Sequence, residues 1–236
     1  MNYSIIIPVH NEEVILEHHV ERFLLELPEV AQRVLSEIVL VENGSTDKTL
    51  AVAERLASRY PDLIHVISLT RGSYGEAIKQ GMMAARGSHL SILECDFLDS
   101  SFLVSSIERF SQDDSPLIIA SKRHPSSIDR RRITRRFLTF AFNLMLRLIL
   151  GYPGTDTHGL KSIETKLARR LCEAAITQDE VFQTEIVLLA WRWGVMIEEF
   201  PITVEELRPT PLSVRRRLPM FLQCIGQLRD SLNRYK

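Results

Sequence analysis

Apolar residues in the first half of the chain alternate between short continuous runs and longer segments in which they recur every three or four positions. The continuous runs have the composition of buried strands, and they cover residues 4–9, 37–41, 63–69, 88–93 and 116–121. The periodic segments between them predict helices, and their candidate capping side chains are Asn11, Ser45 or Thr46, and Ser100 or Ser101. This alternation predicts an α/β fold with a mainly parallel sheet covered by helices on both faces.

The pattern changes after residue 123. Five arginines between positions 130 and 136 lead into an apolar segment over 137–150, which Gly151 and Pro153 end. The elements expected beyond it are a loop over 154–161, helices over 164–175 and 181–193, strand-like segments over 195–204 broken at Pro201, and a basic helical tail over 212–235. This second region is therefore expected to be largely helical.

Composition adds an asymmetry that the pattern does not show. The 236 residues are 45% hydrophobic and carry a net charge of −1, which excludes a collagen-like or extended disordered chain. Residues 1–118 carry a net charge of −9 and residues 119–236 carry +8. A basic half that follows an acidic half indicates an anionic partner.

Signals for secretion or membrane spanning are not evident in the sequence. Met1 is followed directly by a strand-like run, and no stretch reaches about 18 uninterrupted apolar residues. Cys95, Cys172 and Cys224 have neither a zinc-site spacing nor that of a disulfide framework. We therefore expect a reduced, cytosolic compartment.

Polar clusters follow three of the predicted strands, at residues 8–13, 42–47 and 94–96. Ligands of open α/β sheets bind beyond the carboxyl ends of the strands, so these clusters are expected to share one site. Glu94 and Asp96, two apart on an extended segment, would point to the same side. Two such carboxylates could hold a hard cation, Mg²⁺ or Mn²⁺, although a solvated turn is the alternative.

An ordered set of motifs resembles the family 2 glycosyltransferases of GT-A fold, most of all their dolichol-phosphate mannose synthase-like branch. The motifs are IIIPVHNEE at 5–13, VENGSTD at 41–47, GEA at 75–77, ECD at 94–96, ASKR at 120–123, DTHGLK at 156–161, TE at 184–185 and EEFPI at 198–202. Each motif alone is weak, but they occur in order between residue 3 and about residue 208. The resemblance therefore covers nearly the whole chain.

The resemblance implies a division of labour along the chain. It implies a nucleotide-sugar half over 1–123 and an acceptor half over 124–211 in one GT-A domain, followed by a basic helix over 212–236. The implied donor-nucleotide residues are Pro8, His10, Asn11, Glu12, Glu42, Gly44, Ser45, Lys79 and Cys95. Glu94 and Asp96 would hold the metal and the diphosphate at a D-x-D-like motif, and Lys122 and Arg123 would lie near the phosphates. The implied catalytic residues are Asp96 and Asp156.

The motifs also depart from the family pattern. Glu42 and Asn43 stand where two aspartates are common, Glu94 replaces the first Asp of D-x-D, and His10 stands where Tyr is common. A Glu carries the same charge one methylene further out, so metal binding is still expected, with shifted geometry. A catalytically degenerate module that only binds nucleotide-sugar is an alternative.

The arginine run and the apolar segment indicate the acceptor. Guanidinium groups match phosphate oxygens well, but no nucleic-acid motif accompanies the run, so nucleic acid is not expected as a partner. A helix over 133–150 could lie at a membrane interface with its arginines at the headgroups; a buried core helix is the alternative. The resemblance places the contacts to an acceptor phosphate at Arg135 and Thr139.

The reaction implied by the resemblance is inverting transfer of a sugar from a nucleoside-diphosphate donor. A polyprenyl phosphate acceptor is already an anion and needs no strong base, whereas a hydroxyl acceptor, the alternative, would need one. Asp156 is the candidate base for a hydroxyl acceptor. His158 is expected to be solvated, with a base or a ligand as the alternative, and Glu185 is either a site residue or buried with a partner. We expect a cytoplasmic protein, peripheral at a membrane when its acceptor is a lipid.

Three other classes lack their signatures. A processive polymer synthase would carry Gln-x-x-Arg-Trp, and a sugar nucleotidyltransferase would carry a glycine-rich run after the first strand. A Rossmann dehydrogenase needs G-x-G-x-x-G between a strand and a helix, and the first loop has no glycine. The sequence leaves the sugar, the base and the oligomeric state open.

Overall fold

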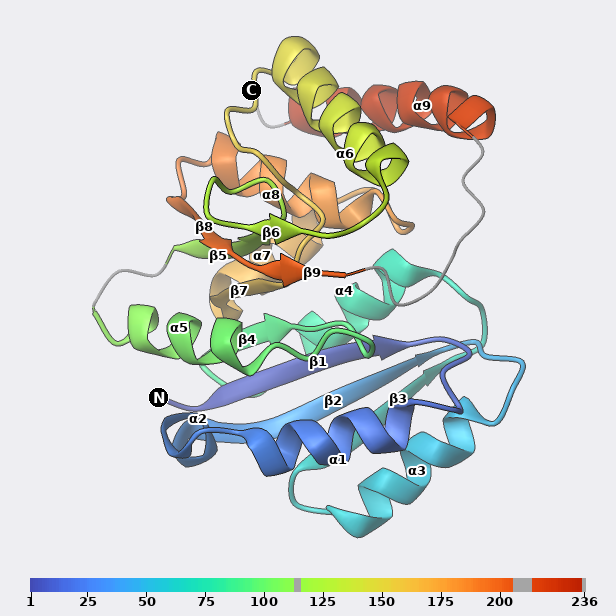
Figure 1. Cartoon of the computed structure of the whole chain (residues 1–236), viewed down its shortest axis with the longest axis vertical. Coiled ribbons are helices and arrows are strands. Elements are labelled where there is room, and N and C mark those ends of the chain that lie inside the picture. The colour runs from blue at the N-terminus through green and yellow to red at the C-terminus, as the bar shows by residue number, and fades with distance from the viewer. Residues whose placement is uncertain (113–115, 206–213, 235–236) are drawn as a thin grey trace.

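The computed structural model describes residues 1–112, 116–205 and 214–234, with the side chains of all of these except 214–223. Seven strands form one sheet in the order β3-β2-β1-β4-β7-β5-β8 (Figure 1). The strands are β1 (Tyr3–Val9), β2 (Leu35–Asn43), β3 (Ile64–Leu69), β4 (His89–Ile92), β5 (Leu117–Ser121), β7 (Lys161–Glu164) and β8 (Ile197–Pro201). All neighbouring strands are parallel except at β7. The predicted α/β class is therefore confirmed.

Helices cover both faces of this sheet (Figure 1). They are α1 (Leu16–Glu26), α2 (Glu29–Val34), α3 (Thr49–Arg59), α4 (Tyr74–Ala84), α5 (Ser100–Phe110), α6 (Ile133–Met145), η1 (Leu146–Leu150), α7 (Thr165–Ala174), α8 (Phe182–Arg192) and α9 (Val214–Asn233). Alternate residues of β1 enter two separate cores: Ile6 packs with α4, α7 and α8, whereas Ile5 and Ile7 pack with α1, α3 and α5. This explains why the strands read as continuous apolar runs, because both faces are buried.

Strand β7 was not expected. It is a four-residue strand that runs antiparallel between β4 and β5, so that Lys161 pairs with Ile92 and Ile119. The expected loop over 154–161 therefore enters the sheet at the edge where β4 ends. A second, two-stranded sheet of β6 (Ile128–Asp129) and β9 (Thr203–Val204) was also not expected.

The predicted helix caps are wrong. Helix α1 begins after Ile15 and α3 after Lys48, neither with a capping side chain, and Asp99 rather than a serine caps α5. Asn11 instead has a left-handed backbone, with φ of 55°, and its side chain bonds to another loop. Polar residues after β1 and β2 thus serve loop-to-loop contacts, which local sequence does not reveal.

The expected helix over 133–150 is confirmed as α6 continued by the π-helical turn η1. Leu138, Phe142 and Leu146 face the core, and Gly151, with φ of 74°, ends the segment. No helix within the described ranges is long and apolar enough to cross a membrane. The expected basic tail is helical over α9, whereas the side chains of Arg215–Arg217 and residues 212, 213, 235 and 236 lie outside what the structure describes.

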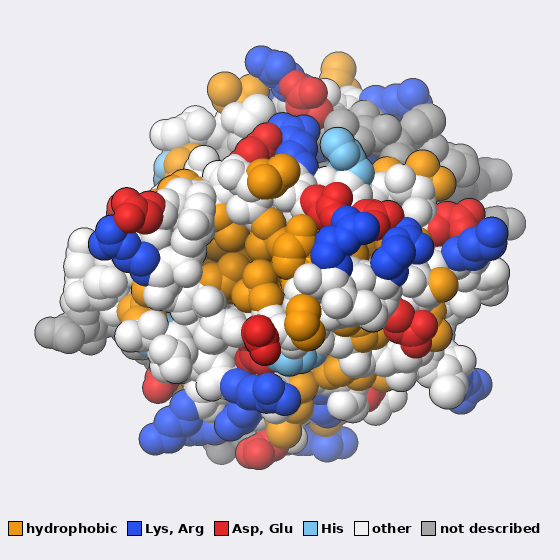
Figure 2. Space-filling view, turned by 90° about the horizontal axis from the view of Figure 1, so that it is seen from below, with side chains coloured by type: hydrophobic (Ala, Val, Ile, Leu, Met, Phe, Trp, Pro, Cys, Tyr) orange, Lys and Arg blue, Asp and Glu red, His pale blue; other side chains and the backbone are white. Residues whose placement is uncertain are grey.

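Acidic side chains also lie on α1, at the end of the sheet that carries β3. Figure 2 shows apolar side chains at the centre of this end, with acidic and basic side chains around them. Glu17 and Glu21 of α1 pair with Arg55 and Arg59 of α3. Part of the negative charge in the first half is therefore helix surface and does not belong to a ligand site.

Candidate active site

The loops after β1 and β2 are joined into one structure. The Asn11 side-chain oxygen accepts from the Thr46 amide at 2.8 Å, and the Asn11 amide donates to Ser45 Oγ at 3.0 Å. His10 Nδ1 lies 2.8 Å from the Asn43 carbonyl, and the Glu12 amide donates to Thr49 Oγ1 at 2.7 Å. These predicted donor-site residues thus lie together at the carboxyl edge of the sheet.

Glu42, at the carboxyl end of β2, holds this edge through hydrogen bonds. Its buried carboxylate accepts from the Ser45 amide at 2.5 Å and from Ser68 Oγ at 2.8 Å. The turn that it closes contains Gly44, whose φ is 63° and whose missing Cβ would lie 2.7 Å from the Gly72 nitrogen. Glu42 therefore holds the loop after β2 through one carboxylate oxygen and strand β3 through the other.

The Glu94–Asp96 segment is a tight turn rather than the extended segment expected. The Phe97 amide donates to the Glu94 carbonyl at 2.8 Å. Burial raises the pKa of Glu94, the Asp96 charge adds to that rise, and Lys122 and Lys161 oppose it. The two carboxylates are therefore close enough to repel each other, which a bound cation would relieve.

These two carboxylates suit a cation that is shared with a ligand. No group of three or more His, Cys, Asp or Glu side chains suited to a metal occurs in the described part of the chain. Mg²⁺ in phosphate-handling sites uses one or two carboxylates with substrate phosphates and water, rather than a full protein cage. Glu94 and Asp96 fit that arrangement, in which a bound ligand and water would supply the remaining oxygens.

Strand β7 brings the loop before it to the same edge. Gly159 makes this approach possible, because a Cβ there would lie 1.8 Å from the Ala120 carbonyl oxygen. Asp156 is fully buried in this loop and accepts from the amides of Thr157 at 2.8 Å, His158 at 3.0 Å and Lys122 at 3.1 Å. Burial alone would raise the pKa of Asp156, but Lys122 and these amides outweigh it and lower that pKa.

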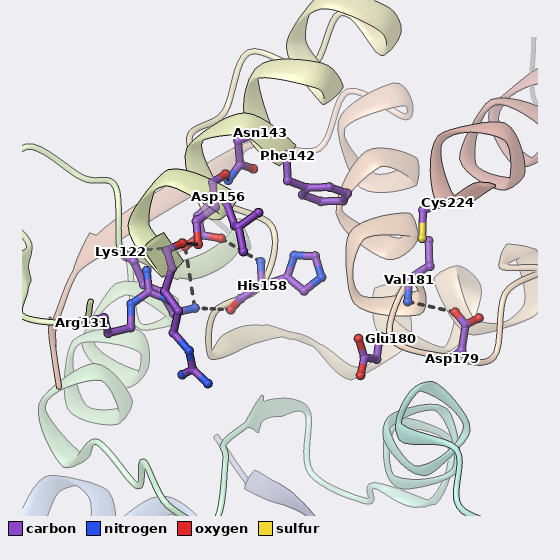
Figure 3. A pocket seen from close by; sticks show the side chains of 13 residues that line it. Lys122, Arg131, Phe142, Asn143, Asp156, His158, Asp179, Glu180, Val181 and Cys224 are labelled. Carbon is purple, nitrogen blue, oxygen red and sulfur yellow. Dashed lines mark hydrogen bonds and ion pairs between the residues drawn. The ribbon is translucent and has the colours of Figure 1, made fainter. Parts of the chain in front are cut away.

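A cavity of about 540 Å³ opens between this loop, α6 and the start of α8 (Figure 3). It brings together four residues predicted for catalysis or acceptor binding, Lys122, Arg135, Thr139 and Asp156. Its other lining residues are Arg131, Leu138, Phe142, Asn143, His158, Asp179, Glu180, Val181 and Cys224. Arg131 is held by a two-point pair with Asp129, and Thr139 Oγ1 donates to the Arg135 carbonyl at 3.0 Å.

His158 was expected to be solvated, which is wrong. Its ring packs edge-on against Phe142, with centroids 5.3 Å apart, and points toward the cavity (Figure 3). Burial lowers its pKa to about 4; Asp156 opposes this shift, and Lys161 and Lys122 add to it. His158 is therefore a neutral imidazole at physiological pH.

Several predicted residues lie apart from these groups. Burial raises the pKa of the Cys172 thiol on α7, and the charge of Lys79 on α4 opposes that rise. Arg123 lies over the Phe140 ring at 5.1 Å. Pro8 and the Cys95 side chain are buried, and the Cys95 carbonyl accepts from His19 Nδ1 at 2.9 Å. Pro8 and Cys95 can therefore contact a ligand only through backbone or shape, whereas the roles predicted for the Lys79 and Arg123 side chains stay predictions.

Glu185 is a structural residue in this molecule. It is fully buried, accepts from the amides of Ile176 at 2.9 Å and Thr177 at 2.8 Å, and also accepts from Ser231 Oγ. It therefore anchors α9 and the loop before α8.

Other residues at the site were not singled out from the sequence. Tyr74 and Gln183 lie beside Glu94, and Asn143 and Glu180 line the cavity. Only Asn143 carried a signal, as a polar residue within an apolar helix.

Fold and site together define an α/β class with a candidate ligand site at the carboxyl edge of a mainly parallel sheet, next to a cavity lined by three basic and three acidic side chains. The chain belongs to the glycosyl transferase family 2, whose family model matches residues 4–171. The GT-A fold is shown by glucosyl-3-phosphoglycerate synthase from Mycobacterium tuberculosis, solved with Mg²⁺ and uridine diphosphate: the TM-score is 0.70 and the identity 20%, over 98% of this chain and 79% of that one. The predicted family and fold are confirmed.

The curated relatives match most of this chain but are longer than it. Glycosyltransferase AglD of Haloferax volcanii is 26% identical over 215 residues, which are 90% of this chain but only 34% of that protein. The dolichyl-phosphate beta-glucosyltransferase ALG5A of Trichomonas vaginalis is 25% identical over 94% of this chain and 71% of that protein. The human dolichyl-phosphate beta-glucosyltransferase is 24% identical over 89% and 69%. The chain thus spans about a third of the first relative and about 70% of the other two.

Proposed function

We propose that this chain transfers a sugar from a nucleoside-diphosphate sugar to a polyprenyl phosphate. One observation carries the proposal. The cavity beside the candidate donor edge brings Lys122 together with Arg135 and Thr139 of the first half of α6, a helix whose outer face is apolar. Such a place suits an anion attached to a hydrocarbon chain. The names of the dolichyl-phosphate relatives support it, and they make a glucosyl donor the first to test.

The outer face of α6 and η1 supports contact with a membrane surface. Ile133, Phe137, Phe140, Leu144 and Leu148 recur at helical spacing and are 39–81% exposed. Exposed basic side chains on the same segment, Arg132, Arg136 and Arg147, would reach headgroups while the apolar stripe enters the interface. These side chains support a peripheral location at a membrane surface, and we propose its cytoplasmic face.

Glu94 and Asp96 would hold Mg²⁺ or Mn²⁺ together with the donor diphosphate. The cation supplies charge neutralisation for the leaving diphosphate when it is bound. Lys122, whose ammonium donates to the His158 carbonyl and lies 3.8 Å from Asp156, would stand between donor and acceptor phosphates. Glu42 and Asn11 would hold the loops that frame the nucleoside.

The electrostatics of Asp156 favour an acceptor that needs no base. Its lowered pKa and its three backbone amide donors make it a weak proton acceptor. A phosphate monoester is already deprotonated enough to attack. Asp156 would then position Lys122 and the loop over 156–158.

The test is a transfer assay with labelled UDP-glucose, GDP-mannose and other nucleotide sugars, Mn²⁺ or Mg²⁺, and short polyprenyl phosphates. We expect a sugar-lipid phosphate product with at least one donor. Nucleotide-sugar binding without transfer or donor hydrolysis would identify a degenerate binding module instead, and transfer only to a hydroxyl acceptor would overturn the lipid-phosphate assignment.

A further inference from the structure

A buried chain of polar side chains runs from β7 to Glu94. Lys161 Nζ donates to the Gly159 carbonyl at 2.9 Å and to Gln183 Oε1. Gln183 Nε2 donates to the Tyr74 hydroxyl oxygen at 2.8 Å, and that hydroxyl donates to Glu94 Oε1 at 3.3 Å. The chain thus joins four residues from β7, α8, α4 and the turn after β4.

The direction of these hydrogen bonds is set at the Lys161 end. Burial lowers the pKa of Lys161 to about 7, and in its ammonium form Lys161 has donors only, so the Gln183 amide then turns its oxygen toward Lys161 and its NH₂ toward Tyr74. The Tyr74 oxygen then accepts, and its own proton is left for Glu94. In a chain of single donors and acceptors, fixing one end fixes the direction of each bond.

Burial makes this arrangement costly to change. Lys161 is fully buried and Gln183 is 3% exposed, and Lys161 has no ion pair among the residues that the structure describes. A buried ammonium that lost the Gln183 oxygen would leave a donor unsatisfied. The amide of Gln183 is therefore locked in one orientation.

The last bond of the chain leaves part of the Glu94 carboxylate open. Its distance of 3.3 Å exceeds the usual 2.7–2.8 Å of such bonds, and no other hydrogen bond to this carboxylate occurs within the described ranges. One oxygen is held by Tyr74, and the other can turn toward Asp96 and a cation.

We propose that Lys161, Gln183 and Tyr74 are positioning residues that orient the Glu94 carboxylate for a divalent cation, an inference that rests on the proposed function. None of the three would touch the cation or the sugar. The chain compensates for the Glu in place of Asp, because a side chain one methylene longer has one more rotation to restrain.

The decisive experiment measures Mn²⁺ binding directly, by the loss of its free electron paramagnetic resonance signal in the presence of UDP. Tyr74→Phe removes only the hydroxyl and should weaken Mn²⁺ binding roughly tenfold. Gln183→Met should weaken Mn²⁺ binding by a similar factor. The double variant should lose about tenfold in Mn²⁺ affinity, as each single variant does, rather than about a hundredfold, because both substitutions interrupt the same series of hydrogen bonds. Saturating Mn²⁺ should restore kcat in Tyr74→Phe, without a change in the KM for polyprenyl phosphate.

Tyr152→Phe is the matched control, since the Tyr152 hydroxyl is buried without a hydrogen-bond partner among the described residues. It should bind Mn²⁺ as the unaltered protein does. Tyr74→Phe with an unchanged Mn²⁺ affinity would overturn the positioning role while leaving the transferase proposal intact, and so would independent, multiplicative losses in the double variant. If Gln183→Met does not fold, Tyr74→Phe alone decides. Failure of the unaltered protein to bind both UDP and Mn²⁺ would remove both proposals.

Discussion

The donor edge and the acceptor cavity are built in opposite ways. At the donor edge, His10, Asn11 and Glu42 are held by hydrogen bonds between the loops after β1 and β2, which follow adjacent parallel strands. The cavity instead joins the α6 helix, the loop before β7 and the start of α8, which do not follow adjacent parallel strands. The first arrangement depends on contacts between two loops that follow neighbouring parallel strands, and the second depends on one antiparallel strand.

This difference should appear in the effects of substitutions. Changes at the donor edge should alter nucleotide or metal binding alone, whereas changes at β7 should disturb the cavity and the donor carboxylates together. The four predictions that follow test this separation, beginning with the largest expected effect.

Replacing Asp96 with Ala should abolish metal-dependent donor binding, with a loss of roughly 100-fold or more. Partners of metal ligands already contribute about 10–100-fold, and a ligand should contribute at least as much. Calorimetric titration of UDP with and without Mn²⁺ measures this. Asp62→Ala, in the exposed turn before β3, is the control; an Asp96→Ala protein with normal Mn²⁺-dependent affinity would remove the metal role.

Replacing Gly159 with Ala should destabilise the fold by about 3 kcal/mol, because the new methyl group would overlap the Ala120 carbonyl in the middle of the sheet. Urea unfolding followed by circular dichroism gives the free energy of unfolding. Gly226→Ala is the matched control: its Cβ meets nothing within 4 Å on α9, and it should stabilise the protein by up to about 1 kcal/mol. Equal stability of both variants would contradict the role given to β7.

Replacing Arg135 with Ala should raise the KM for polyprenyl phosphate about 10- to 100-fold and leave the KM for the nucleotide-sugar unchanged. A charge-assisted hydrogen bond to phosphate contributes about 1.5–3 kcal/mol. Arg33→Ala, in an exposed pair with Glu29, is the control. An equal rise in both KM values would contradict a separate acceptor cavity.

Lowering the pH from 6.5 to 4 should reduce the free energy of unfolding by roughly 2 kcal/mol through His158. Its pKa is about 4 in the folded protein and about 6.5 when unfolded, so the unfolded state binds more protons in this window and acid favours it. His158→Asn should flatten the pH dependence, whereas His18→Asn, exposed on α1, should not. Identical slopes in both variants would show that the surroundings of His158 do not lower its pKa.

The sequence was informative where structure is local. The strand runs predicted the sheet because both of its faces are buried, and the apolar periodicity with Gly151 predicted α6 and η1. Strand β7 was missed because Lys161 and Ser162 are polar, and their burial depends on neighbours in β4 and β5 that are distant in sequence.

The same reason explains which site residues could be expected. Glu94 and Asp96 follow a predicted strand, so the pattern indicates them, whereas Lys122 and Asp156 were expected from the family resemblance. Tyr74 and Gln183 lie on helices that look ordinary, and only the packing of α4 against α8 brings them to Glu94. From the sequence His158 is an ordinary loop residue, and only the folded structure shows that Phe142 of α6 packs against its ring.

Acceptor choice tests the central claim most directly. The unaltered protein with labelled UDP-glucose, or with whichever nucleotide-sugar it turns over, and Mn²⁺ is offered a short polyprenyl phosphate and the matching polyprenol without phosphate. We predict that labelled sugar appears on the lipid phosphate and not on the alcohol, because the cavity presents Lys122 and Arg135 to an anionic nucleophile, whereas Asp156, held by three backbone amides, is a weak proton acceptor for a hydroxyl. Equal transfer to the polyprenol, or transfer only to soluble sugars, would contradict the account.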